Sequence, residues 1–188
     1  KVLDASINIK NVIKEDEVNP HVWTSIENYI NQVKEISQVL IQQNSENKQI
    51  YEENTEKYIK DLEKVEKQYE EISQELNGQK AICLNEALEY LAKDIKLEYI
   101  SLHTDHDENS MSAESIKNII NKMNTENIKI ILIGKDDSIK NAEILANETN
   151  AKIYKLDTVL TGATDKSAYI DAANRNLEVL KSVLGDEK

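Results

Sequence analysis

The chain has 188 residues, which is enough for one domain with a helical extension. Its formal net charge of −12 leaves no basic stripe to neutralise phosphates, so nucleic acid and anionic lipid are poor partners. No apolar run approaches the roughly 18 residues that a membrane-spanning helix needs. The only cysteine, Cys83, excludes an internal disulfide, and its apolar neighbours favour a buried structural thiol over a reactive one.

Residues 20–76 are predicted to form two helices. The first starts near Pro20, runs to residue 43 and carries one apolar stripe that needs a surface to pack on. The second is long and covers residues 46–76. A coiled coil is the alternative for this second helix, but the seam would contain three tyrosines: Tyr51, Tyr58 and Tyr69. A long helix braced against a domain is therefore favoured.

After Gly78 the pattern changes to short apolar runs that alternate with amphipathic segments. The apolar runs predict strands over residues 80–84, 97–102, 128–133 and 151–156. The segments between and after them predict helices over residues 86–94, 112–124, 138–149 and 166–184. This alternation predicts an α/β fold: a four-stranded parallel Rossmann-like sheet with helices on both faces, preceded by a long backbone helix.

Parallel sheets bind ligands beyond the carboxyl ends of their strands. In this chain the residues expected at those ends are Asn85, His103, Gly134 and Asp157. These positions are where a functional site is expected from the strand pattern alone.

Several short motifs in this chain resemble those of a known family. Residues 19–23 read Asn-Pro-His-Val-Trp, which is similar to the Asp-Pro-His-x-Trp motif of the cluster 9 (zinc and manganese) solute-binding receptors. Residues 85–91, Asn-Glu-Ala-Leu-Glu-Tyr-Leu, resemble its His-Asp-Ala-Phe-x-Tyr-Leu segment. Further resembling segments follow the family's order and are residues 1–6, 47–58, 108–110, 156–157 and 169–177. Each motif is weak alone, but together they cover essentially the whole chain.

The resemblance implies three parts in this chain. Residues 1–45 are expected to be the end of an N-terminal lobe, most of which is not in this chain. Residues 46–77 would form the long interlobe helix, and residues 78–188 the C-terminal α/β lobe. The uncovered stripe of the helix over residues 20–43 would lead to self-association, unless the helix folds back or the missing segment covers it.

The resemblance also implies a metal site made by His21, Asp157 and Asn85. Asn85 departs from the family, which has histidine or glutamate there, and Gly134 stands where an acidic residue is frequent. An amide oxygen is a weaker donor than imidazole, so we expect weaker binding or an oxygen-rich site. The alternatives are a capping or surface role for His21, a strand-end role for Asp157 and a helix N-cap role for Asn85.

Two further groups could bind metal. Glu86 is a fallback ligand next to Asn85. His103 and His106 lie in an acidic loop that could hold an accessory divalent ion or simply be solvated. No nucleophile elbow, phosphate-binding glycine loop or His-Glu-x-x-His motif is present, so we expect a binding protein rather than an enzyme.

The resemblance implies an extracellular or periplasmic receptor that delivers zinc or manganese to the membrane permease of an ABC importer. Lipid anchoring to the cytoplasmic membrane is expected from the family. A degenerate member that acts as a surface interaction or adhesin-like module, without tight metal binding, is the first alternative. An unrelated helical interaction module is the second, and the strand–helix alternation after Gly78 counts against it.

Overall fold

The computed structural model describes residues 2–14, 17–102 and 112–186. It contains a four-stranded parallel sheet in the order β2-β1-β3-β4, as predicted. The strands are β1 (Lys80–Cys83), β2 (Glu98–Ser101), β3 (Ile130–Gly134) and β4 (Lys152–Leu156). Their carboxyl ends lie at one edge of the sheet because all the pairings are parallel.

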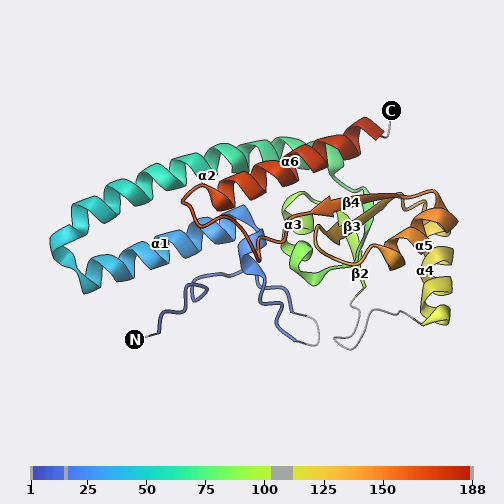
Figure 1. Cartoon of the computed structure of the whole chain (residues 1–188), viewed down its shortest axis with the longest axis horizontal. Coiled ribbons are helices and arrows are strands. Elements are labelled where there is room, and N and C mark those ends of the chain that lie inside the picture. The colour runs from blue at the N-terminus through green and yellow to red at the C-terminus, as the bar shows by residue number, and fades with distance from the viewer. Residues whose placement is uncertain (1, 15–16, 103–111, 187–188) are drawn as a thin grey trace.

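Helices cover both faces of the sheet, which also confirms the prediction (Figure 1). Because side chains alternate along each strand, the core around the sheet is divided into two clusters, one on each face. On one face, Ala81 and Leu132 join a cluster with the long helices, and on the other, Ile82 and Ile131 join a cluster with two short helices. The helices of the first face are α1 (Ile26–Gln43), α2 (Lys48–Leu76), α3 (Glu89–Asp94) and α6 (Ala168–Asp186); those of the second are α4 (Ala113–Glu126) and α5 (Lys140–Thr149).

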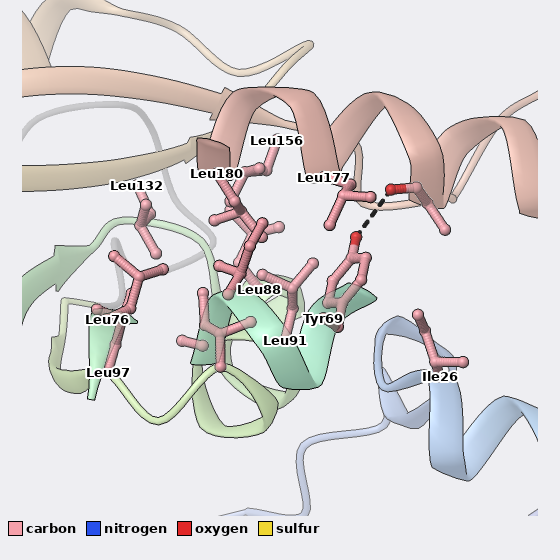
Figure 2. Close-up of a cluster of buried hydrophobic side chains, with 14 of the residues drawn as sticks. Ile26, Tyr69, Leu76, Leu88, Leu91, Leu97, Leu132, Leu156, Leu177 and Leu180 are labelled. Carbon is pink, nitrogen blue, oxygen red and sulfur yellow. Dashed lines mark hydrogen bonds between the residues drawn. The ribbon is translucent and has the colours of Figure 1, made fainter. Parts of the chain in front are cut away.

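The first face holds the larger cluster (Figure 2). Leucines from α2, α3, β3, β4 and α6 meet there, and the hydroxyl of Tyr69 donates to the carbonyl oxygen of Ala173 at 2.9 Å. Burial raises the pKa of Tyr69 far above its ordinary value, so the phenol remains a donor. The long helix is therefore braced against the α/β part of the chain, in agreement with the favoured interpretation.

The helices α1 and α2 form an antiparallel hairpin that projects from the sheet (Figure 1). The 3₁₀ turn η2 (Ser45–Asn47) joins them, and the hydroxyl of Thr55 donates to Ser37 at 2.7 Å across the pair. Folding back onto α2 buries Ile26 and Ile30, but Ile36 and Leu40 stay exposed. Part of the apolar stripe on α1 is thus covered and part is not.

The first helix begins later than predicted. Pro20 precedes a 3₁₀ turn, η1 (Val22–Thr24), and α1 starts only at Ile26. Ser25 is its N-cap, because the Ser25 hydroxyl accepts a hydrogen bond from the amide of Asn28 at 3.3 Å. The residues around Pro20 are consequently free to form the irregular segment that carries His21.

Two other features of the sequence have clear structural causes. Gly78, at the turn from α2 into β1, has a φ of +79°, a conformation that favours glycine. Cys83 is fully buried in β1, and burial raises the pKa of its thiol to about 12, as a structural thiol requires. No helix in the described ranges has the length and apolar character needed to cross a bilayer.

Candidate metal centre

The segment before α1 positions His21 through Asn19. The side-chain nitrogen of Asn19 donates to the carbonyl oxygen of Glu86 at 2.8 Å and to the buried carboxylate of Glu89 at 3.0 Å. Its backbone oxygen accepts a hydrogen bond from the hydroxyl of Tyr90 at 2.9 Å. These contacts fix which end of the Asn19 amide is oxygen, because two acceptors face its nitrogen.

The oriented Asn19 oxygen in turn fixes the ring of His21. It lies 3.0 Å from the His21 backbone nitrogen and 3.0 Å from ring atom Nδ1. An amide oxygen can only accept, so Nδ1 carries a proton, and in the neutral ring Nε2 keeps its lone pair. The His21 side chain is 16% exposed, and its ring meets Trp23 edge-on with centroids 5.3 Å apart. The arrangement makes Nε2 the atom able to bind a metal ion.

Glu86 contacts the same ring from the Nδ1 side. Its carboxylate oxygen lies 3.5 Å from His21 Nδ1. Glu86 is also the first residue of η3 (Glu86–Leu88), which leads into α3. Glu86 therefore faces the protonated ring nitrogen of His21 rather than Nε2.

Asn85 caps the turn that follows β1. Its side-chain oxygen accepts from the amide of Ala87 at 2.8 Å, and its side-chain nitrogen donates to the carboxylate of Asp137 at 2.8 Å. Both ends of the amide are thus engaged in the geometry expected of an N-cap residue.

Asp137 also explains the glycine at the end of β3. The Asp137 carboxylate accepts from the amide of Gly134 at 2.8 Å. A Cβ at position 134 would lie 2.7 Å from that carboxylate, so any side chain would collide with it. An acidic group therefore does stand near this strand end, but it comes from three residues further along the chain.

Asp157, directly after β4, is 3% exposed and has both carboxylate oxygens in use. One oxygen accepts from the amide of Val159 at 2.9 Å; the other lies 2.8 Å from Lys135 Nζ and 3.0 Å from a guanidinium nitrogen of Arg175. Burial alone would raise the pKa of Asp157, but the hydrogen bonds from Lys135, the Val159 amide and Arg175 outweigh it. The pKa lies below its ordinary value, and the group is a carboxylate at neutral pH.

The segment that carries His21 contacts the segment that follows β4. Trp23, two residues after His21, donates through its indole nitrogen to the carbonyl oxygen of Thr158 at 3.1 Å, next to Asp157. Within residues 2–14, 17–102 and 112–186, however, no three His, Cys, Asp or Glu side chains are close enough to hold a metal ion together. His103 and His106 lie outside the described residues.

Several residues of this centre escaped the sequence analysis. Asn19 and Glu89 hold His21, Asp137 holds Asn85, and Lys135 and Arg175 pair with Asp157. Asn19 could have been found, because it lies inside the His21 motif. Lys135 could not, because nothing local distinguishes it from other lysines and its partner is 22 residues away.

The four-stranded parallel sheet and its helices have the fold of metal-binding solute receptors. The chain superposes on the crystal structure of the metal-dependent lipoprotein YcdH from Bacillus subtilis with a TM-score of 0.79 and 28% identity. That superposition covers 95% of this chain and 68% of YcdH.

This chain belongs to the family described as zinc-uptake complex component A, periplasmic, whose model matches residues 1–183. It is 31% identical over 172 residues to the high-affinity zinc uptake system protein ZnuA of Bacillus subtilis (strain 168), covering 89% of this chain and 54% of that protein. It is 22% identical over 176 residues to the manganese ABC transporter substrate-binding lipoprotein scaA of Streptococcus gordonii, covering 91% and 56%. The chain thus spans about half the length of these curated relatives.

Proposed function

We propose that this protein binds a divalent transition-metal ion, zinc or manganese, and delivers it to the membrane permease of an ABC importer. The protein works outside the cytoplasmic membrane, anchored there by lipid. Its task is binding and release, not catalysis. Membership of the zinc-uptake family and the names of the two curated relatives support this proposal.

The observation that carries the proposal is the orientation of His21. An imidazole whose Nδ1 proton is held by an anchored acceptor presents Nε2 as a preformed ligand. Asp157 and Asn85 complete the set that we propose, with Glu86 as the fallback ligand; His103 and His106 would hold a separate accessory ion. The described residues do not gather three acidic, histidine or cysteine ligands, so binding requires a further ligand or a rearrangement.

The chemistry of this set suits two kinds of ion. Zinc favours imidazole and thiolate, whereas manganese accepts carboxylate and amide oxygen. One imidazole with the Asp157 carboxylate serves either ion. Because the Asn85 oxygen is engaged by the Ala87 amide, its use as a ligand would cost that cap, so the site is weaker than one with a third imidazole.

The alternative is a surface interaction or adhesin-like module that keeps the fold without tight metal binding. Two observations favour it: Asn85 acts as a cap, and Asp157 is already neutralised by two cations. Both observations concern the same residues that the receptor proposal needs, so one titration separates the two functions.

That experiment is calorimetric titration of the protein with zinc and with manganese. We expect one ion to bind with a dissociation constant below about a micromolar, about −8 kcal/mol. His21→Ala and Asp157→Asn should each weaken binding strongly, whereas the double variant His103→Ala with His106→Ala should leave it unchanged. If neither ion binds more tightly than about a micromolar, the interaction-module function takes its place.

A further inference from the structure

Two cations converge on one oxygen of a buried acid. Lys135 and Arg175 both contact Oδ2 of Asp157, at 2.8 Å and 3.0 Å. A single carboxylate needs only one cation to balance it, and a buried carboxylate binds such a partner more strongly than an exposed one does. The second oxygen is used by the Val159 amide.

The backbone around this group is held firmly. Asn176 binds Asp157 on both sides, accepting from its amide at 2.6 Å and donating to its carbonyl oxygen at 2.9 Å. The Lys135 amide donates to the carbonyl oxygen of Leu156 at 2.7 Å. The backbones of Asp157 and Lys135 are therefore fixed relative to each other, so this ion pair opens by movement of a side chain, and the Lys135 side chain is the more exposed of the two.

The Lys135 side chain can move away from Asp157. It is 36% exposed, so its ammonium can move from Asp157 to water, where it is well hydrated. A divalent ion at Oδ2 would otherwise sit within a few ångströms of a positive ammonium, and that repulsion opposes binding. Arg175, 59% exposed and 3.0 Å away, is the weaker obstacle of the two.

We propose that Lys135 sets the metal affinity of this centre by competing with the ion for the Asp157 carboxylate. The inference rests on the proposed function and adds a residue that weakens binding and so favours release. The apparent affinity falls with the fraction of molecules in which Asp157 is free of the ammonium. A receptor that must hand its ion on benefits from such a limit.

The test is calorimetric titration with zinc and with manganese of the wild type and Lys135→Met. Methionine keeps the length of the side chain but removes the charge. We expect Lys135→Met to bind the preferred ion about tenfold more tightly or better. Lys135→Arg keeps a cation beside Asp157 and should bind as weakly as the wild type; Lys135→Gln serves as a second neutral variant should the methionine variant not fold.

Lys80→Met is the matched control. Lys80 pairs with Glu126 at 2.8 Å with a side chain 39% exposed, so the variant removes the same charge from a similar ion pair. It lies at the amino end of β1, at the opposite edge of the sheet, and should leave metal affinity unchanged.

The outcomes distinguish this inference from the proposed function. The inference is supported if Lys135→Met binds an ion more tightly than the wild type and Lys80→Met does not. It is also supported if Lys135→Met binds an ion that the wild type does not bind. Equal or weaker binding by Lys135→Met, with a wild type that does bind, overturns the inference alone. A lack of binding by the wild type and by both neutral variants overturns the proposed function and the inference together.

Discussion

At the scale of single residues, Asn19 positions His21. Its side-chain nitrogen donates to Glu86 and Glu89, and its backbone oxygen accepts from Tyr90. Its side-chain oxygen decides which ring nitrogen of His21 is protonated. The buried Glu89 carboxylate thus acts on the ring through Asn19, in the manner of a group that orients a metal ligand without touching the metal.

Asn19→Ala should weaken metal binding by about 10- to 100-fold, because the His21 ring loses the contact that holds its orientation. Titration calorimetry measures the change. Asn8→Ala is a suitable control, since Asn8 also donates to a carboxylate, that of Glu35 at 2.7 Å, but on the surface. Unchanged affinity in Asn19→Ala would show that Asn19 does not position the ligand.

The candidate ligands could be read from the sequence, but most of their partners could not. His21 and Asp157 lie in motifs a few residues long, which local patterns reveal. The cations on Asp157 are 22 and 18 residues distant in sequence, and only the parallel sheet and the packing of α6 bring them together. For Asn85 the sequence left both a ligand role and a cap role open. Its cap contact with Ala87 is local, but its other contact, with Asp137, is 52 residues away.

At the scale of elements, the start of α1 meets the end of α3 at a partly buried acid. Asp94 accepts hydrogen bonds from the Ser25 hydroxyl and the Ile26 amide. Burial, with the nearby charges of Glu27 and Glu66, nevertheless raises the pKa of Asp94 from 3.8 to about 6.

The raised pKa predicts a pH dependence of stability. The folded Asp94 binds its proton more tightly than the unfolded one, so this stabilisation is present below about pH 4 and is lost as the pH rises through about 6. Asp94→Asn should raise the free energy of unfolding at pH 7 by about 1–2 kcal/mol and flatten its slope between these pH values.

Denaturant unfolding at a series of pH values measures this effect. Asp61→Asn is the control, because Asp61 is exposed and its hydrogen bond from Lys64 lowers its pKa instead. If the free energy of unfolding changes between pH 4 and pH 6 by the same amount in the wild type and in Asp94→Asn, the assignment is contradicted.

The elements themselves were largely predictable. The strand β3 follows from an apolar run that is buried along its whole length, and α4 follows from an apolar stripe on one face. The error at Pro20 has a local cause: proline suits a helix start, but Ser25 offers the better cap, and the 3₁₀ turn between them accommodates His21.

At the scale of the whole molecule, the α1–α2 hairpin leaves apolar surface uncovered. Ile36 and Leu40 lie exposed on α1, on a face that α2 does not cover. Neighbouring exposed apolar side chains favour association, since joining two such surfaces removes both from water. We therefore propose that the chain associates through this face.

Light scattering should give an average mass above that of the monomer at high protein concentration. Changing both Ile36→Lys and Leu40→Lys should return the mass toward that of the monomer, whereas Ile144→Lys, at an exposed isoleucine of α5, should not. A strictly monomeric wild type would contradict the proposed association.

The central claim is that His21 binds the metal ion through Nε2, and anomalous diffraction at the zinc edge from crystals grown with zinc tests it most directly. The account predicts an anomalous peak about 2.0–2.1 Å from His21 Nε2. A peak bonded to Nδ1, or a well-ordered zinc site elsewhere with none at His21, would contradict it.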